Sequence, residues 1–308
     1  MADRPLLGFV LLTHERPKQV LRLINRLNIL FECPPIACHN DFSKCELPEG
    51  EIPDNVTFVR PHLETLWGHW SLVEATMRAM KMLFERPDSP EWFILLSGTD
   101  YPIKPPEVIR EHYRESTGDA CMNTTRLVKS GLDNELKRKA YERYRSIRLK
   151  YPSIFHFIHS LRIRRWYRAD INLKRPIYNN WSIPFNEDFV CFMGDQWFSA
   201  RQKAAEEILR KKKKNRKVRN HYRRVQCPDE SYFHTILMNS ERINAPPCSL
   251  RYVEWVEGAS NPKWLGMDDL PKLLESNDHF ARKFDMRSDS EVLDKLDEIN
   301  GYRNRLQG

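Results

Sequence analysis

The sequence predicts an α/β domain built on a mostly parallel, doubly wound sheet. Two continuous apolar runs, Leu7 to Thr13 and Trp92 to Ser97, are typical of parallel strands buried on both faces. Between such runs, apolar residues recur at helical spacing, and this alternation favours a sheet flanked by helices. With 308 residues, 41% of them hydrophobic, the chain can bury a substantial core, and we expect residues 1–308 to form a single domain.

The first half of the chain carries the clearest alternation. Each strand is followed by polar residues, and ligands of open α/β sheets bind beyond the carboxyl ends of the strands. Residues that directly follow strands are therefore the first candidates for a site. The expected elements are strand Leu7–Thr13, helix Lys18–Leu30, strands Pro35–His39 and Val56–Val59, helix Ser71–Phe84 capped by Ser71, and strand Trp92–Ser97.

The second half is less regular. A basic and aromatic stretch at about 126–181 interrupts the alternation, and we interpret it as an insertion or helical subdomain. The elements expected after it are strand Phe189–Met193, helix Ser199–Leu209, helix Glu230–Met238 after Pro228, strand Arg251–Val256, and helices from Asp269 to Leu296 joined by a turn around Asn277-Asp278.

Positive charge is concentrated in two stretches. The formal net charge is +8, and lysine and arginine are concentrated in Lys137–Arg175 and Arg210–Arg224. An acidic lipid surface, a polyanionic acceptor and nucleic acid all fit such charge. For Arg210–Arg224 we favour a solvated, mobile loop or helix end, and for Ile154–Arg168 an interfacial amphipathic helix and a buried helix fit equally well.

The N-terminus and the cysteines indicate a compartment. The apolar segment Leu6–Leu12 is too short for a signal peptide or a membrane span, so we expect a cytoplasmic protein. The seven cysteines are irregularly spaced and lack a Cys-x-x-Cys pair, which favours reduced thiols over a disulfide framework or a zinc site. We expect Cys121 and Cys191 to be ordinary core residues.

Taken singly, the candidate site residues have simpler explanations. Glu230 ends the segment Cys227-Pro228-Asp229-Glu230, where Pro and acidic residues are also good helix-start chemistry. Asp41 after its strand fits a turn. Trp67 and Trp70 are more readily explained as core aromatics than as a sugar platform.

Five segments in order change this balance, because together they resemble the core-2/I-branching glycosyltransferases, glycosyltransferase family 14. This family includes β-1,6-N-acetylglucosaminyltransferases, peptide O-xylosyltransferases and plant glucuronosyltransferases. The resemblance spans Leu7 to about Asp297, and its sequence departs from the usual pattern at Asp195. The five segments are Trp67-Gly68-His69-Trp70-Ser71, Leu95 to Lys104 (LLSGTDYPIK), Gly194-Asp195-Gln196-Trp197-Phe198, Cys227-Pro228-Asp229-Glu230, and Phe280 to Asp285 (FARKFD).

The resemblance implies a GT-A-like, Rossmann-type fold with a C-terminal diphosphate-binding segment at about 257–297. It also implies inverting transfer of a sugar, with N-acetylglucosamine favoured and xylose as the alternative, from a UDP-sugar to a glycan hydroxyl. Glu230 would be the general base. The residues that the family pattern assigns to UDP binding are Thr13, His14, Asp41, Lys263, Arg282 and Lys283, and those assigned to the donor-sugar and acceptor pocket are Trp70, Asp100, Gln196, Trp197 and Trp255.

We expect no metal and no other cofactor. Many sheet-based transferases hold a divalent metal with an Asp-x-Asp pair at a strand end, whereas here Asp268-Asp269 lies in the tail and Asp100 stands alone. Lysine and arginine would then stabilise the leaving diphosphate. The expected partners are a UDP-sugar, a glycan acceptor and, peripherally, an anionic membrane. A nucleic-acid-binding protein using residues 210–224 is the alternative from another class, although the chain has no recognisable DNA or RNA module, and we expect no nucleic acid.

Overall fold

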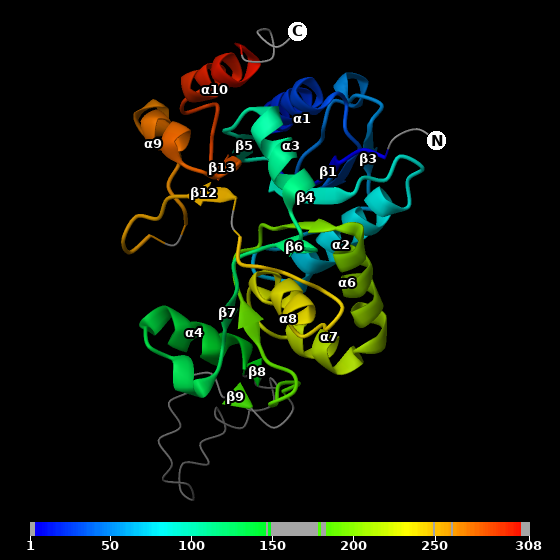
Figure 1. Cartoon of the computed structure of the whole chain (residues 1–308), viewed down its shortest axis with the longest axis vertical. Coiled ribbons are helices and arrows are strands. Elements are labelled where there is room, and N and C mark those ends of the chain that lie inside the picture. The colour runs from blue at the N-terminus through cyan, green and yellow to red at the C-terminus, as the bar shows by residue number, and fades with distance from the viewer. Residues whose placement is uncertain are drawn as a thin grey trace, which may run out of the picture.

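A six-stranded sheet forms the centre of the protein, with strand order β3-β2-β1-β4-β11-β6. Figure 1 labels four of its strands, β3, β1, β4 and β6. The computed structural model describes residues 4–145, 147–148, 178–179, 183–248, 250–259 and 261–302. Strands β3, β2, β1 and β4 are parallel, and β11 runs antiparallel to both β4 and β6. The six strands are β1 (Leu7–Thr13), β2 (Ile36–Asn40), β3 (Val56–Phe58), β4 (Trp92–Ser97), β6 (Ala120–Cys121) and β11 (Ser199–Arg201). The expected sheet is confirmed, with an antiparallel side that the sequence did not predict.

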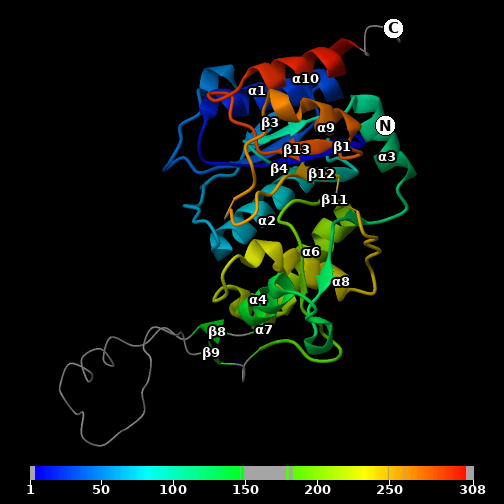
Figure 2. The ribbon, with the colours of Figure 1, turned by 90° about the vertical axis from the view of Figure 1, so that its left-hand side faces the viewer.

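Helices cover both faces of this sheet. Val10 and Phe93 face one hydrophobic core, built with helices α2, α6 and α8, while Phe9 and Ile94 face a second core with α1, α3 and α10. Figure 2 shows α10 lying along α1, where Arg22 forms ion pairs with α10. The helices are α1 (Pro17–Phe31), α2 (Trp70–Phe84), α3 (Pro106–Glu115), α4 (Glu135–Tyr144), α6 (Gln202–Lys214), α7 (Arg216–Tyr222), α8 (Tyr232–Met238), α9 (Leu270–Glu275) and α10 (Glu291–Tyr302).

A second, smaller sheet joins the C-terminal segment to the turn after β4. Strand β13 lies between β12, to which it is parallel, and β5, to which it is antiparallel. Arg282 is thereby placed opposite Asp100. The expectation of only helices and a turn in this tail is wrong, because the tail also contains the strand β13. This strand is too short to show the alternation that identifies a strand in a sequence. The strands outside the central sheet are β5 (Asp100–Pro102), β7 (Thr125–Arg126), β8 (Ile147–Arg148), β9 (Tyr178–Asn179), β10 (Phe192–Met193), β12 (Arg251–Val253) and β13 (Phe280–Arg282).

Several expected boundaries shift. The strand expected from Phe189 is only β10, and the helix expected from Ser199 is preceded by the strand β11. Helix α2 begins at Trp70 and is capped by His69 rather than Ser71. The helix expected from Glu230 is divided into a 3-10 turn and α8, because Ser231 between them is not helical. The 3-10 turns are η1 (Glu49–Glu51), η2 (Lys129–Gly131), η3 (Pro228–Glu230) and η4 (Met267–Asp269).

The two basic stretches differ in what the structure describes. Helix α4 is the described helix of the expected insertion, and Ile154–Arg168 lies outside the described residues. Of the two forms expected for Arg210–Arg224, the helix end is confirmed and the mobile loop is not: the run forms the end of α6 and all of α7, with Val218 and Tyr222 buried. The apolar anchors thus hold the charges on a folded surface.

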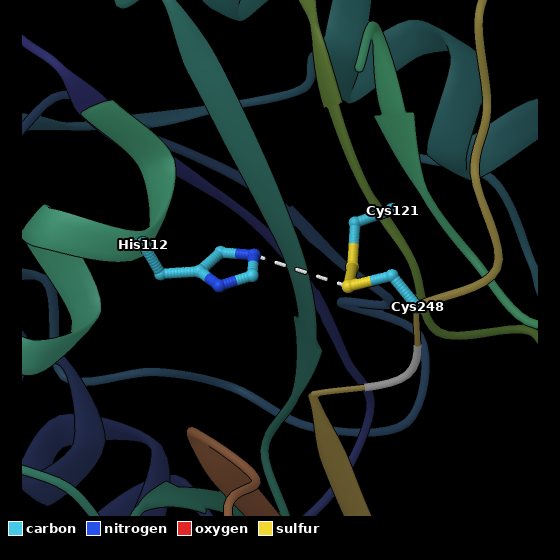
Figure 3. Close-up of side chains that lie close together, drawn as sticks. All are labelled: His112, Cys121 and Cys248. Atoms are coloured by element: carbon cyan, nitrogen blue, oxygen red, sulfur yellow. Dashed lines mark hydrogen bonds between the residues drawn. A yellow bond between two sulfur atoms is a disulfide. The ribbon is translucent and has the colours of Figure 1, made fainter. Parts of the chain in front are cut away.

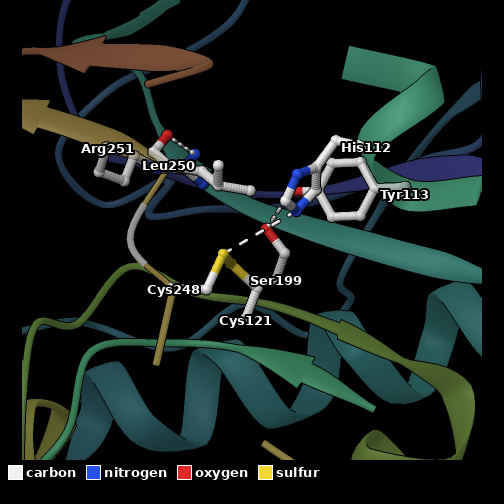
Figure 4. Close-up of a disulfide and its surroundings, with 7 residues drawn as sticks. All are labelled: His112, Tyr113, Cys121, Ser199, Cys248, Leu250 and Arg251. Atoms are coloured by element: carbon white, nitrogen blue, oxygen red, sulfur yellow. Dashed lines mark hydrogen bonds between the residues drawn. A yellow bond between two sulfur atoms is a disulfide. The ribbon is translucent and has the colours of Figure 1, made fainter. Parts of the chain in front are cut away.

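A disulfide joins Cys121 of β6 to Cys248, across a sequence separation of 127 (Figure 4). The expectation that all cysteines are reduced is therefore wrong, since the fold brings together two positions whose spacing gives no signal. Cys191 is buried in the core, as expected. His112 points at the disulfide, with Nε2 3.9 Å from Cys248 Sγ (Figure 3). These three are the one cluster of potential metal ligands found among the described residues, and the disulfide occupies both sulfurs.

Across the described part of the chain, no helix combines the length and the apolar composition that crossing a bilayer requires.

Candidate active site

A cleft of about 430 Å³ opens at the carboxyl ends of β1 and β4. Its wall combines the residues after these strands with residues 195–197, the turn η3 and the end of β13. Val253, Trp255, Asn261, Pro262 and Trp264 complete this part of the wall. A larger cavity, of about 810 Å³, lies along α1, between this helix and residues 46–51, and none of the predicted site residues lines it. Of these two cavities, only the smaller cleft is lined by predicted site residues.

Most of the predicted residues meet in this cleft, and some do not. Those in the wall come from five separate segments of the sequence. The predicted residues that line the cleft are Thr13, His14, Gln196, Trp197, Glu230, Trp255, Arg282 and Lys283, and those that do not line it are Asp41, Trp70, Asp100 and Lys263.

Glu230 is held by the end of helix α4. Arg143 Nη1 donates to Glu230 Oε2 at 3.1 Å, and the Tyr144 hydroxyl donates to the same oxygen at 3.2 Å. The Glu230 side chain remains 38% exposed. Burial raises its pKa, an effect that Arg143 and Tyr144 oppose. A carboxylate with a raised pKa, accessible from a cleft, is suited to accept a proton.

Two further carboxyl groups lie near Glu230. Asp229 is buried, its Oδ1 has no hydrogen-bond partner among the described residues, and burial together with the Glu230 charge raises its pKa to about 7. Asp195 also lines the cleft, and burial raises its pKa while Arg282 opposes the shift. The acidic side of the cleft is thus a group of three carboxyls whose burial favours proton uptake, and repulsion by Asp195 on Glu230 and by Glu230 on Asp229 adds to this effect.

Cations line another part of the cleft wall. The Arg282 guanidinium lies 4.2 Å from the Trp197 ring centroid, and its Nε is 3.9 Å from Asp100 Oδ1. Lys283 Nζ lies 4.3 Å from the Trp264 ring centroid, and no described carboxylate pairs with it. Burial lowers the pKa of both Arg282 and Lys283, and Arg282 lowers that of Lys283 further. An anionic ligand would relieve this repulsion and replace lost hydration.

Lys263 is in a different environment. Its Nζ lies 2.5 Å from Asp269 Oδ1 and 3.8 Å from Glu254 Oε1. The hydrogen bond that Lys263 donates to Asp269 raises the Lys263 pKa. Both of its acidic partners lie outside the cleft wall, so in this conformation Lys263 joins two protein segments.

Asp41 and Asp100 support the cleft from behind. The Asp41 carboxylate is fully buried and accepts hydrogen bonds from the Thr65 amide at 2.7 Å and the Ser43 hydroxyl at 2.6 Å. Burial alone would raise the Asp41 pKa, but these hydrogen bonds hold it well below its usual range. Asp100 Oδ2 accepts from the Ser97 amide at 2.7 Å and fixes the turn after β4. Both acids position residues that do line the cleft.

Exposed tryptophans surround the cleft. Trp67 is 77% exposed and Trp255 is 59% exposed, and both line it together with Trp264. The expectation that Trp67 is a core residue is wrong. Trp70 is in the core, where its ring packs against Tyr232 at 4.9 Å between centroids. Exposed aromatic faces at a cleft offer flat apolar surfaces for a sugar ring.

Gly194 shows how tightly the acidic wall is packed. A Cβ on Gly194 would lie 2.0 Å from the Asn123 carbonyl oxygen and 2.4 Å from His234 Cε1. The Gly194 amide donates to the Glu230 carbonyl at 2.8 Å. The glycine of this sequence segment is therefore required by close approach of backbone to backbone.

Sequence reasoning missed some residues of the site. Arg143 and Tyr144 lie 87 and 86 positions before Glu230 in an irregular basic stretch, and no pattern there marks them. Lys44 and Thr65 line the cleft through their contacts with Asp41. Trp264 follows Lys263 directly, and an aromatic beside a predicted phosphate ligand was an available signal.

Comparison with known proteins assigns the family. The family model described as Core-2/I-Branching enzyme matches residues 38–276. A β-glucuronosyltransferase of Arabidopsis thaliana is 25% identical over 235 residues, covering 74% of this chain and 46% of the relative. Xylosyltransferase 2 of Rattus norvegicus is 25% identical over 265 residues, which is 79% of this chain and 27% of the relative. The chain thus spans less than half the length of these curated relatives. The resemblance found in the sequence is confirmed, and the chain belongs to the Core-2/I-branching enzyme family of glycosyltransferases, glycosyltransferase family 14.

Proposed function

We propose that the protein transfers a sugar from a UDP-sugar to a glycan hydroxyl with inversion, and that Glu230 is the general base. The observation that carries this proposal is one cleft that is lined both by an accessible carboxylate, Glu230, and by two cations, Arg282 and Lys283. The base takes the acceptor proton while the acceptor oxygen bonds to the anomeric carbon, and the UDP oxygen leaves with the electron pair of the broken bond.

The leaving diphosphate is the proposed partner of Arg282 and Lys283. Charge-assisted hydrogen bonds from these side chains would stabilise the developing negative charge, so we propose that no metal is required. The aromatic faces of Trp67 and Trp255 would then contact sugar rings at the open side of the cleft. Thr13 and His14, just after β1, would contact the nucleoside.

The candidate donor sugars are N-acetylglucosamine, xylose and glucuronic acid. The sequence segments favour N-acetylglucosamine, whereas the relatives above are named for glucuronosyl and xylosyl transfer. We therefore propose xylose as the second candidate donor, supported by the names of those relatives. A comparison of these three UDP-sugars as donors will decide between them.

The basic surface of α6 and α7 is the proposed contact with an anionic membrane. The exposed, basic side chains of this surface are Lys213, Lys214, Arg216, Lys217, Arg223 and Arg224. Among the described residues none of them forms an ion pair, so their charge is available to acidic headgroups. Co-sedimentation with anionic but not neutral vesicles is the expected result, and tighter binding to an oligonucleotide of equal charge would instead support nucleic acid as the partner.

The central experiment pairs transfer with binding. In EDTA, the wild-type protein should bind UDP and transfer a sugar from at least one UDP-sugar. Glu230→Gln should lose at least about 100-fold in kcat, as expected for removal of a general base, and should keep UDP affinity within about threefold. Retained turnover in Glu230→Gln would remove the base assignment, and loss of UDP binding in EDTA would remove the metal-free mechanism.

A further inference from the structure

The Glu230 carboxylate receives both of its described side-chain hydrogen bonds on one oxygen. Arg143 and Tyr144, at the end of α4, contact Oε2 at 3.1 Å and 3.2 Å. Among the residues that the structure describes, no group donates to Oε1. The other oxygen is therefore the one available to an acceptor hydroxyl.

The Tyr144 hydroxyl has two possible acceptors and a single hydrogen. Its oxygen lies 3.2 Å from Glu230 Oε2 and 3.0 Å from the carbonyl oxygen of Cys227. A phenol can donate to only one acceptor at a time. While Glu230 is ionised, its charge makes it the stronger acceptor. Once Glu230 is neutral, the Cys227 carbonyl offers an equally near alternative.

The rest of Tyr144 is fixed, so only the hydroxyl hydrogen has to move. The side chain is fully buried, and the residue's own carbonyl contacts His221 Nε2 at 2.6 Å. Arg143 Nη1 also lies 3.5 Å from the Tyr144 hydroxyl oxygen, which can accept from it in either state. These contacts keep the phenol oxygen at the same place before and after proton transfer.

We propose that Tyr144 and Arg143 are positioning residues for Glu230, with the Tyr144 hydrogen bonded to ionised Glu230 before transfer and to the Cys227 carbonyl after Glu230 has taken the acceptor proton. This inference rests on the proposed role of Glu230. In the step, the acceptor O–H bond breaks and its proton binds Glu230 Oε1. Arg143 stays charged beside the neutral acid, which favours release of the proton before the next turnover.

Other charged groups also affect the ionisation of Glu230. Asp195 opposes ionisation of Glu230, and the Glu230 charge in turn opposes ionisation of Asp229 and of the Cys227 thiol. Arg143 and Tyr144 are the groups that favour the ionised carboxylate. Removing either should therefore raise the Glu230 pKa further.

The test is Tyr144→Phe followed by pH profiles. Because a hydrogen bond to a charged group is lost, the acidic limb of kcat/KM should move to higher pH by roughly one unit. On that limb the variant should be about tenfold slower than wild type, and on the plateau close to it. Arg143→Gln should move the limb in the same direction. Arg143→Lys keeps the positive charge, so its limb should lie close to that of the wild type. A purely structural defect would lower the rate equally at every pH.

A second readout does not depend on turnover. Carboxyl NMR of carbon-13-labelled Glu, with the Glu230 signal identified by its loss in Glu230→Gln, should show the same upward shift in Tyr144→Phe. The matched control is Tyr141→Phe on the same helix, whose ring stacks on Arg145 at 5.1 Å. An unchanged or lowered midpoint in both Tyr144→Phe and Arg143→Gln would overturn the proposal. If instead the Glu230 titration midpoints shift upward while Glu230→Gln retains transfer, Arg143 and Tyr144 do stabilise the Glu230 carboxylate, but Glu230 is not the general base.

Discussion

The two lysines that the family pattern assigns to the diphosphate have different surroundings, and this difference gives a quantitative prediction. Lys283 lines the cleft next to Trp264 and has no carboxylate partner among the described residues. Lys263 is paired with Asp269 and Glu254 outside the cleft wall. Replacing Lys283 by glutamine should therefore mainly weaken ligand binding, and replacing Lys263 by glutamine should mainly lower stability.

The magnitudes follow from the contacts. Lys283→Gln removes one charge-assisted contact to a phosphate, worth about 1.5–3 kcal/mol, and partial solvation of Lys283 favours the lower end. At about 1.4 kcal/mol per tenfold, the Kd for UDP should rise about 10- to 30-fold. Lys263→Gln should change this Kd less than about threefold. It should lower the free energy of unfolding by about 1 kcal/mol, because the side chain of Asp269, only 4% exposed, loses its cation but keeps the Gly266 amide.

Titration calorimetry with UDP and denaturant unfolding of both variants would measure these effects. The pH dependence of UDP binding gives a further test. Burial and the nearby Arg282 lower the pKa of Lys283. As the pH rises through that lowered pKa, Lys283 loses its charge and UDP binding should weaken. Lys283→Gln should lack this loss. Equal weakening by both substitutions, or a larger effect of Lys263→Gln, would refute the assignment of Lys283 as the phosphate contact in this conformation.

Two further predictions concern the frame of the cleft. Gly194→Ala should destabilise the protein by about 3 kcal/mol, because its Cβ would lie 2.0 Å from the Asn123 carbonyl oxygen, whereas Gly50→Ala meets no atom within 4 Å and serves as the control. Loss of the Cys121–Cys248 disulfide, by Cys121→Ser or by dithiol reduction, should lower the free energy of unfolding by up to about 5 kcal/mol, since the bond closes a long loop between cysteines with a sequence separation of 127. Denaturant unfolding measures both, and a Cys121→Ser variant as stable as the oxidised protein would exclude the disulfide.

The elements that could be predicted from sequence are those whose pattern is long enough to be distinctive. β1 and β4 are buried along nearly their whole length, so each appears as an unbroken apolar run. β13 is three residues long and is defined by its partners β12 and β5 rather than by a pattern of its own. β11 is equally short, and it directly precedes a helix with a clear periodicity, so the sequence predicts Ser199–Arg201 to be part of that helix.

Contacts between remote segments explain the other differences. Cys121 and Cys248 meet because the segment before β12 returns to the edge strand β6, and nothing near either cysteine indicates this. Arg143 and Tyr144 reach Glu230 because α4 docks beside η3 through the buried Tyr144 ring. Periodicity describes one element at a time, whereas these pairings depend on how elements assemble.

The positions of Asp41 and Asp100 refine what a family sequence pattern can identify. Asp100 belongs to one of the five segments that carry the family resemblance, and the family pattern assigns Asp41 to UDP binding, yet both carboxylates are buried behind the wall. Asp41 holds Thr65, which lines the cleft, and Asp100 holds Ser97 while facing Arg282. A pattern selects residues that the site needs, and it does not distinguish a ligand contact from the support of one. Glu230 and Lys283 differ from these acids because they line the cleft and are partly exposed, and this exposure, together with the pattern, supports the proposal that they carry the chemistry.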